Sequence, residues 1–433
     1  MKRTPTYTQR LVAARLLHRF NFGPLPGQYA ALLNQGTTAT KTAVLKHNLE
    51  DPGIASLVAP ALTDLGPYPQ SNTPAATAFY DAMNQGNIDL TTWWLDRMVL
   101  AHYPLIERMT WFWHGHWATS ISKVNYPMPM QLQNNTLRRY ALGNFKDMAG
   151  AMVLDGALNY WLDNEDNYVS SPNENLAREF MELFTLGVNR FSQADVTAAA
   201  SALTGYQTVQ SNGTVTFNAK QHDPSALSVL GTRGPLNAEG LAALVVGQRQ
   251  NATFIAERLW FRFVSSTTKP PASLAASFSR RDIAATVESL VHSSAWAAPA
   301  NSLVKSPIEW FVGACRALRV RPSTLNVSDL LWGLSQMGQV PFNPPNVGGW
   351  PYGQAWLSGA AFQYRFEVAQ LVVAKGDLAP LLVSPTKMVQ ACADWLGVAE
   401  WSRRTASTLA ATVATPSELA IAALCAPEYV VSV

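Results

Sequence analysis

TTWWLDRMVLAHYPLIERMTWFW, residues 91–113, repeats large apolar side chains at spacings of three and four. The positions that carry this repeat are Leu95, Met98, Val99, Leu105, Ile106 and Met109. The spacing predicts a long amphipathic α-helix, and Pro104 predicts a kink in it, because proline removes a backbone N–H and crowds the preceding turn. The same periodicity predicts further helices at 132–153, 195–203, 252–264, 281–292, 306–319 and 327–337. We therefore expect a mainly α protein.

Two segments depart from this helical pattern. Residues 206–209 and 214–217 flank Ser211-Asn212-Gly213, and Asn-Gly suits a tight turn that needs a positive φ, so we predict a small β-hairpin insertion. Residues 338–358, GQVPFNPPNVGGWPYGQAWLS, hold too much proline and glycine for a helix or a strand. We predict that this second segment is an ordered, functional loop.

Composition sets the scale of the domain. The chain has 433 residues, of which 48% are hydrophobic and 14% charged, so a large core is expected and disorder is not. Neither a linker nor a repeat of fixed period interrupts it. We predict one elaborated helical domain over residues 1–433, with a motif-bearing core at about 90–230 and a C-terminal helical lobe at about 250–433.

Charge and cysteine content bear on partners and compartment. The net charge of +3, with no stripe of basic residues, argues against a nucleic-acid partner. Three scattered cysteines argue against a zinc-thiolate site. The basic N-terminus lacks the apolar core of a signal peptide, and no apolar run reaches the roughly eighteen residues of a membrane span. We expect a soluble, cytoplasmic protein, with co-export beside a partner left open.

The first candidate for chemistry is Trp111-Phe-Trp-His114-Gly115-His116-Trp117. On a regular helix, side chains two residues apart point about 200° away from each other. Gly115 favours a break in the helix, after which both imidazoles could bind one metal ion, and neutral imidazole suits zinc, iron, copper or nickel. The alternative is a pair of histidines that form hydrogen bonds inside an aromatic core.

The second candidate is SPNENLAREFMELFTLG, residues 171–187. Ser171 and Glu174 match a capping box, Pro172 suits the first helical position, and Gly187 suits the helix end, so Glu174 has a sufficient structural role.

On a helical wheel Glu179 falls inside the apolar arc of the same segment, and Glu182 lies at its edge beside Arg178. A buried carboxylate must be paired, protonated or metal-bound. Glu179 is therefore either a site residue or the partner of an arginine such as Arg138 or Arg178.

The third candidate is Gln221-His222-Asp223-Pro224, which Pro224 places in a loop. His222 and Asp223 could bind a metal ion or act as an imidazole with a local acid, although such pairs are also common in turns.

The sequence lacks G-x-S-x-G, the P-loop, G-x-G-x-x-G and H-E-x-x-H. Serine-elbow hydrolysis and nucleotide binding through the usual loops are therefore disfavoured.

Taken together, these motifs resemble those of the bacterial "domain of unknown function 1800" family over roughly residues 10–365. The resemblance rests on RLLHRFNFGP, PLIERMTWFWHGHWATSISKV, Gln133-Asn134 with Arg138 and ALGNF, PNENLAREFMELFTLGV, ALTGY, HDPSALSVLG and PPNVGGWPYGQAWLS. It implies a mostly helical bacterial protein, often encoded beside a sulfatase-like partner, with no settled activity. Members commonly have a lysine shortly after the His-Asp pair, where this chain has Ser225, Ala226, Leu227 and Ser228.

Our leading hypothesis is a metal-dependent enzyme that uses zinc, iron, manganese or copper. The expected metal ligands are His114, His116, Glu179 and His222, and the expected catalytic groups are Glu182, Asp223 and Arg178. We favour a hydrolase, in which the metal activates water. The alternatives are an oxygen-activating oxidoreductase with iron or copper, and a non-enzymatic binding protein whose histidines and glutamates form structural networks.

Overall fold

The computed structural model describes residues 5–432, which fold almost entirely into helices. The helices of the first half are α1 (Tyr7–Asn21), α2 (Gln28–Gln35), α3 (Thr37–Leu45), α4 (Pro74–Leu100), α5 (Leu105–His116), α6 (Ile121–Val124), α7 (Pro127–Arg139), α8 (Phe145–Val153), α9 (Gly156–Trp161), α10 (Asn175–Glu179) and α11 (Gln193–Ala202). Those of the second half are α12 (Ala238–Gly247), α13 (Arg249–Phe263), α14 (Ala272–Ser277), α15 (Ile283–His292), α16 (Pro307–Leu318), α17 (Val327–Gln336), α18 (Gly359–Val373), α19 (Pro385–Leu396), α20 (Arg403–Ala410), α21 (Pro416–Leu424) and α22 (Pro427–Val430).

Short helical turns and three antiparallel strand pairs complete the described chain. The turns are η1 (Asn164–Asp166), the π-helical η2 (Phe180–Leu186), η3 (Ser294–Ala297), η4 (Pro322–Thr324), η5 (Gly353–Trp356) and η6 (Ala379–Leu381). The strands are β1 (Tyr206–Val209) with β2 (Thr214–Phe217), β3 (Ala226–Val229) with β4 (Thr232–Pro235), and β5 (Leu303–Val304) with β6 (Val431–Ser432). The prediction of a mainly α protein is confirmed.

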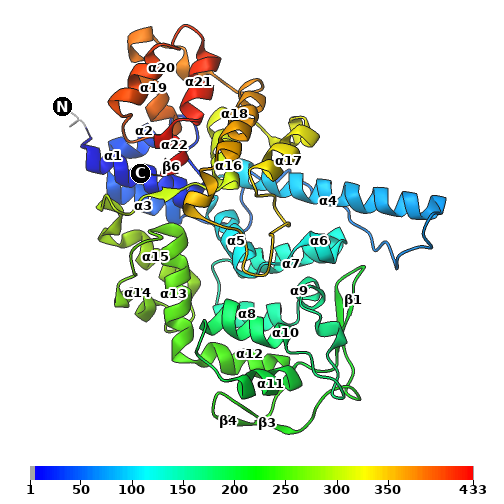
Figure 1. Ribbon diagram of the computed structural model, residues 1–433. Helices are drawn as coiled ribbons and strands as arrows, with labels where there is room; N and C mark the ends of the chain where they lie inside the picture. Colours follow the sequence, from blue (N-terminus) through cyan, green and yellow to red (C-terminus); the bar gives the residue numbers. More distant parts are fainter. Residues whose placement is uncertain (1–4, 433) are drawn as a thin grey trace.

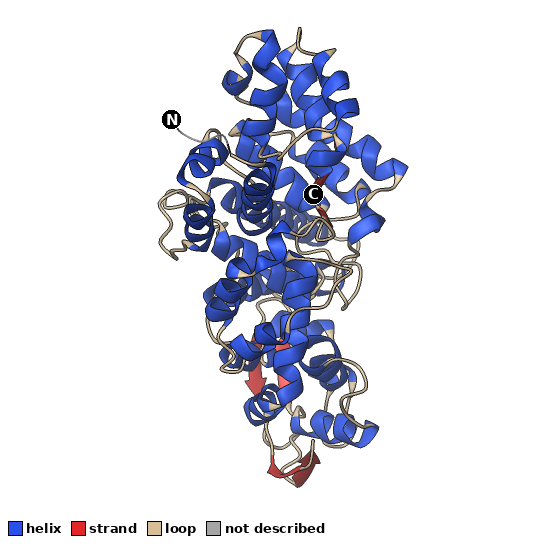
Figure 2. Cartoon of the chain, turned by 90° about the vertical axis from the view of Figure 1, so that its left-hand side faces the viewer, coloured by secondary structure: helices blue, strands red, loops and turns tan. Residues whose placement is uncertain are grey.

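The molecule is elongated, with α19–α21 at one end and the β3–β4 hairpin beside α11 at the other, while β1–β2 runs along one edge near α9 (Figure 1). Figure 2 shows the same long axis from the side, with helices along most of its length. The helix α4 projects sideways from the middle of the body (Figure 1). No helix of residues 5–432 combines the length and hydropathy that a bilayer crossing requires.

Two apolar clusters form the core, and α5 lies between them. The first cluster gathers α1, α7, α8 and α10–α15, and the second gathers α4 and α16–α22. From α5, Met109, Phe112 and Trp113 join the first cluster, whereas Trp111 joins the second. The apolar residues of α5 thus contact both clusters, and almost the whole helix is buried between them.

Several local predictions are confirmed. The helix α11 begins at the predicted cap, where Ser192 and Asp195 form a capping box. The predicted hairpin is β1–β2, with Tyr206 opposite Phe217, and Gly213 in its turn has a φ of 72°. The second hairpin, β3–β4, was not predicted. Leu227 and Val229 alternate on β3, but β4 is Thr-Arg-Gly-Pro and carries no apolar pattern of its own.

Other local predictions were wrong. Pro104 does not kink one helix but separates two, since α4 ends at Leu100 and α5 begins after the proline. The range 132–153 likewise holds two helices, α7 and α8, with residues 140–144 between them. Ser171 and Glu174 form no capping box, because α10 begins at Asn175 with Glu174 at its N-cap position and without a side-chain cap.

The predicted loop at 338–358 is confirmed, since η5 is its one regular element among these described residues. It lies directly against α5. Gly349 has a φ of 85°, and a Cβ atom there would sit 2.5 Å from the carbonyl oxygen of Gly115. Only glycine allows this approach, which brings Trp350 and the residues after it over the middle of the molecule.

Candidate functional site

The two histidines of the His-Gly-His motif do not face one ligand. The expected break at Gly115 is wrong, because α5 continues to His116 and therefore keeps the two imidazoles about 200° apart. His114 lies in the second apolar cluster, with ring centroids at 5.2–6.1 Å from those of Trp94, Trp111, Phe342 and Trp350. His116 lies in the first cluster, among Phe112, Trp113, Trp117, Phe145, Phe184 and Phe254.

Each histidine instead fastens one distant segment to α5. The Nε2 of His114 accepts a hydrogen bond from the backbone N–H of Phe342 at 3.1 Å. The Nε2 of His116 lies 2.8 Å from the carbonyl oxygen of Phe184 and so donates to it. Burial lowers the pKa of each imidazole to about 3, so both are neutral near pH 7. Hydrogen bonds of this kind hold the 338–358 loop and η2 in place, which is a structural role.

The acidic residues of the 171–187 segment separate into two groups. Glu174 accepts hydrogen bonds from Arg178, Gln193 and Thr197, so Arg178 is directed at α11 and not at Glu179. Glu179 is half-buried, and partial burial together with the nearby charge of Glu182 raises its pKa.

The helical wheel holds only as far as Glu179, where the regular α-helix α10 ends. The π-helical turn η2 begins at Phe180 and shifts each following residue around the axis. Glu182 lines a surface groove of about 460 Å³ with Arg190, Arg249, Glu257 and Arg258.

His222 and Asp223 lie in the loop after β2. The Nδ1 of His222 is 3.0 Å from the carbonyl oxygen of Thr204, and the ring packs edge-on against Phe217. Asp223 accepts a hydrogen bond from the backbone N–H of Ser225, which lowers the pKa of its carboxyl group.

The predicted metal ligands therefore do not meet. Within residues 5–432 no three His, Cys, Asp or Glu side chains converge in a way that could hold an ion. The donor set expected from the sequence does not fit a shared metal site.

The buried Arg138 of α7 pairs elsewhere. Arg138 donates to both carboxylate oxygens of Glu107, at 2.8 and 3.1 Å, and Arg97 donates to the same carboxylate. These two arginines lower the pKa of Glu107 to about 2 although burial opposes them. Neither Arg138 nor Arg178 is thus the partner of Glu179.

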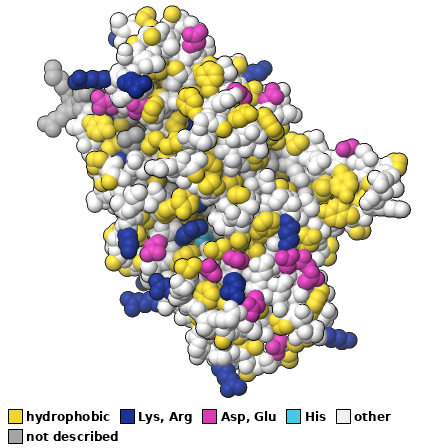
Figure 3. Space-filling view, viewed as in Figure 1, with side chains coloured by type: hydrophobic (Ala, Val, Ile, Leu, Met, Phe, Trp, Pro, Cys, Tyr) yellow, Lys and Arg dark blue, Asp and Glu magenta, His cyan; other side chains and the backbone are white. Residues whose placement is uncertain are grey.

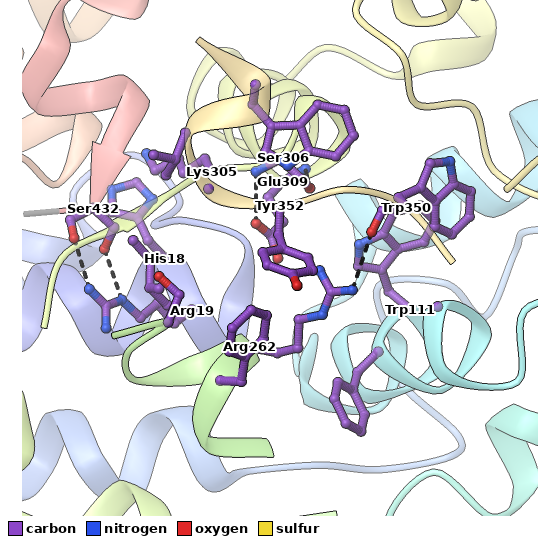
Figure 4. A pocket seen from close by; sticks show the side chains of 18 of the residues that line it. His18, Arg19, Trp111, Arg262, Lys305, Ser306, Glu309, Trp350, Tyr352 and Ser432 are labelled. Atoms are coloured by element: carbon purple, nitrogen blue, oxygen red, sulfur yellow. Dashed lines mark hydrogen bonds between the residues drawn. The ribbon is translucent and has the colours of Figure 1, made fainter. Parts of the chain in front are cut away.

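A pocket opens where α1, α5, α13, the start of α16 and the 338–358 loop meet (Figure 4). We call it the central pocket. It offers about 80 Å³, enough for several water molecules at roughly 10–15 Å³ each, and it is open to solvent on one side. On the face shown in Figure 3, a hollow near the middle of the molecule has basic side chains inside it.

The lining of the central pocket is basic and aromatic. Its charged residues are Arg19, Arg108, Arg262, Lys305 and Glu309. Its aromatic residues are Trp111, Phe112, Phe261, Trp350, Tyr352 and Trp356. Lys305, His18 and Arg19 lie on the opposite side from Trp111 and Trp350 (Figure 4). Four basic residues thus face one acid among the described lining residues.

Two of these basic groups are already satisfied by the protein. Arg19 donates to the carbonyl oxygens of Phe263, Val264, Asn301 and Ser432 and to the Ser432 hydroxyl. Arg108 donates to Glu309, whose other oxygen accepts from the backbone N–H of Ser306 at 3.0 Å. The one acid of the lining is consequently engaged.

Arg262 is not satisfied in this way. Its Nη2 makes one long hydrogen bond, 3.5 Å, to the carbonyl oxygen of Trp350, and its guanidinium lies 5.1 Å from the Tyr352 ring centroid (Figure 4). No carboxylate among residues 5–432 forms an ion pair with it. Burial, and then the charge of Arg258, lowers the pKa of Arg262 to about 10, so it stays charged near pH 7.

Lys305 is the other basic group without an acceptor. It precedes Ser306, the N-cap residue of α16, and is 5% exposed. Its Nζ has no hydrogen-bond partner within the described residues and lies 3.5 Å from the ring centroid of Tyr429. Burial lowers the pKa of Lys305 well below its usual value, and Glu309 opposes that effect.

Our sequence analysis missed Arg262, Lys305 and Glu309. Two signals were present. Ser306-Pro307-Ile308-Glu309 is a capping box that fixes the residue before it. Arg258 and Arg262 stand four apart among the large apolar residues at the end of α13. Their burial depends on the 338–358 loop, which folds back from far along the chain, so spacing alone could not show it.

Comparison with known proteins adds a family but no activity. The family described as "Protein of unknown function (DUF1800)" matches residues 15–431, almost the whole chain. No curated protein matches the chain, and no solved structure does.

Proposed function

The chain belongs to the DUF1800 family, whose description names no activity, and we propose that it binds a small organic anion in the central pocket. The observation that carries this proposal is Arg262, a charged guanidinium directed into the pocket with no carboxylate partner among residues 5–432. A partly buried charge without a partner is unfavourable unless something else compensates it.

Electrostatics favour an anion over a cation or a neutral ligand. The single acid of the described lining, Glu309, is held by Arg108 and a backbone N–H, and its charge offsets one of four basic residues. Arg19 and Arg262 remain as net positive charge even if Lys305 is neutral. Guanidinium groups bind carboxylates and phosphates through paired hydrogen bonds, so Arg262 is suited to either.

The aromatic walls favour a ligand with a flat apolar part. Trp111 and Trp350 stack with their ring centroids 5.0 Å apart, and Tyr352 packs edge-on against Phe261 at 4.4 Å. Rings of this kind bury large apolar area and contact planar groups well. A ligand such as an aromatic carboxylate would place its anionic group on Arg262 and its ring against these aromatic side chains.

The metal-dependent hydrolase and the oxygen-activating oxidoreductase stay predictions. The ligands expected for them are dispersed, and two of the four, His114 and His116, fasten other segments to α5. The sulfatase-like partner protein is likewise an expectation from the family resemblance. Of the hypotheses drawn from the sequence, a non-enzymatic binding protein is the one that agrees best with the central pocket, and the small anionic ligand is the addition proposed for it.

Calorimetric titration with benzoate and benzamide tests the proposal. The two probes have nearly the same size and differ in charge. We expect benzoate to bind and benzamide to bind at least tenfold more weakly. In Arg262→Gln the benzoate affinity should fall by about 10- to 100-fold, since a hydrogen bond to a charged group contributes about 1.5–3 kcal/mol.

Arg233→Gln is the matched control, because Arg233 is exposed on β4 and lies outside the central pocket. It should bind benzoate as the unsubstituted protein does. Equal affinity for benzoate and benzamide, or an Arg262→Gln variant that keeps full benzoate affinity, would contradict the proposal.

A further inference from the structure

Arg258 is a second arginine of α13 that lacks a carboxylate partner. It lies four residues before Arg262 in a regular α-helix, so the two side chains leave the same face, one turn apart. Cβ atoms at this spacing are about 5–6 Å from each other. The ion pairs of residues 5–432 include neither arginine. Two guanidinium groups without an acid thus stand next to each other on one helix.

The acids of the neighbouring groove do not neutralise Arg258. Glu182 and Glu257 line that groove with it, yet neither takes part in an ion pair within residues 5–432. Burial lowers the pKa of Arg258, and the group that opposes this effect is the phenol of Tyr352, not a carboxylate. The guanidinium lies 6.0 Å from the ring centroid of Phe254, the outer limit of a cation–π contact. Its charge is therefore left for a ligand to compensate.

Three neighbours place Arg258 beside the central pocket. Arg262 lines the pocket, and the charge of Arg258 lowers its pKa. Tyr352 lines the pocket too, and its phenol acts on both arginines. The charges of both arginines also lower the pKa of His116, which follows Gly115 of the lining. Because such effects weaken with distance, Arg258 lies close to the pocket lining while it also lines the groove.

We propose that the ligand of the central pocket is a dianion, and that Arg258 binds its second acidic group while Arg262 binds the first. This inference rests on the proposed function and narrows its ligand class to molecules such as aromatic dicarboxylates, whose two acidic groups are about one helical turn apart, roughly 5 Å. The central pocket is open to solvent on one side, so the ligand need not fit wholly inside it.

The pair of arginines favours two negative charges over one. Like charges four residues apart on a helix repel each other, and one carboxylate on Arg262 leaves Arg258 without an anion. A dianion compensates both charges. It also offers each guanidinium a carboxylate that can accept two parallel hydrogen bonds. Arg258 is in this way a residue that determines specificity for the charge of the ligand.

Calorimetric titration of the intact protein with terephthalate and 4-carbamoylbenzoate tests the inference. The two probes share a ring and nearly the same size, but the second has an amide in place of one carboxylate and so carries one charge. We expect terephthalate to bind at least about tenfold more tightly, since a charged hydrogen-bond partner is stronger than a neutral one. In Arg258→Gln this preference should disappear, while the affinity for 4-carbamoylbenzoate should stay within about threefold of its original value. Arg258→Lys keeps the charge without the paired donors and should recover part of the preference.

Arg249→Gln is the matched control. Arg249 begins α13 and lines the same groove, but it lies about 13 Å along the helix axis from Arg258. The variant removes an equal charge and should keep the preference for terephthalate. Equal losses in Arg249→Gln and Arg258→Gln would show that the overall charge of the groove attracts the dianion, and would overturn the role of Arg258.

The failures of the two proposals are distinguishable. Benzoate binding that depends on Arg262, together with equal affinities for terephthalate and 4-carbamoylbenzoate, would overturn the dianion and leave the proposed function standing. A preference for terephthalate that persists in Arg258→Gln would overturn the second contact alone. Failure of benzoate, terephthalate and 4-carbamoylbenzoate to bind at all would overturn both proposals.

Discussion

Acid should weaken this fold through the two histidines of α5. His114 and His116 are buried and have pKa values of about 3 in the folded chain, against about 6.5 for an unfolded histidine. Folding lowers the pKa of these histidines, so as the pH falls the unfolded chain binds protons before the folded chain does. Acid therefore lowers the free energy of unfolding. The contribution of each histidine is complete above pH 6.5 and falls as the pH drops from there towards 3.

The size of the effect follows from these values. Between pH 7 and pH 5 each histidine should reduce the free energy of unfolding by about 2 kcal/mol, because at pH 5 the unfolded imidazole is almost fully protonated and the folded one is not. His116→Gln removes one such group and keeps a donor for the carbonyl oxygen of Phe184. We expect it to be less stable than the unsubstituted protein at pH 7, with a gap that shrinks by about 2 kcal/mol at pH 5.

Urea denaturation at both pH values measures these free energies. Exposed His47 supplies the control, and His47→Gln should follow the unsubstituted protein at each pH. Acidic residues such as Glu107 also respond to acid, but they are present in all three proteins and cancel in the comparison. A gap between the unsubstituted protein and His116→Gln that is the same at pH 7 and pH 5 would refute the reasoning.

Three further predictions follow from buried groups and close contacts. Glu107→Gln should lose about 3–5 kcal/mol in urea denaturation at pH 7, because two buried arginines lose their carboxylate, whereas exposed Glu288→Gln should change little. Burial raises the pKa of Asp155 to about 6, so its ionised carboxylate lowers the free energy of unfolding above pH 6, and this effect is absent below pH 4. Asp155→Asn should therefore be more stable than the unsubstituted protein by about 2–3 kcal/mol at pH 8 and equally stable at pH 4. Gly349→Ala should weaken benzoate binding in calorimetry, because its Cβ would meet the Gly115 carbonyl oxygen and displace the loop over the central pocket.

The fold class and several elements could be predicted from local pattern. The apolar spacing of three and four, the Ser192 cap and the Asn-Gly turn are local signals, and they placed helical segments, the start of α11 and the β1–β2 hairpin correctly. Helix breaks were harder to place, since nothing in the spacing shows that Pro104 ends one helix and starts another. The π-helical turn after Glu179 is also invisible to a wheel that assumes a constant 100° per residue.

The site was misplaced for a different reason. His114 and His116 stand out in the sequence because two imidazoles flank a glycine, yet their partners are backbone atoms of Phe342 and Phe184 that no side-chain pattern reveals. Arg262 and Lys305 look ordinary in the sequence. They become exceptional when a loop from far along the chain encloses them without supplying an acid.

A crystal structure with 4-bromobenzoate, read through the anomalous signal of bromine, tests the central claim most directly. The account predicts one strong bromine peak inside the central pocket, with the carboxylate within hydrogen-bond distance of the Arg262 guanidinium and the ring against Trp350 or Tyr352. A bromine peak only in the groove beside Glu182, or only elsewhere on the surface, would contradict it, and so would a fully ordered central pocket without ligand at a concentration that saturates binding in solution.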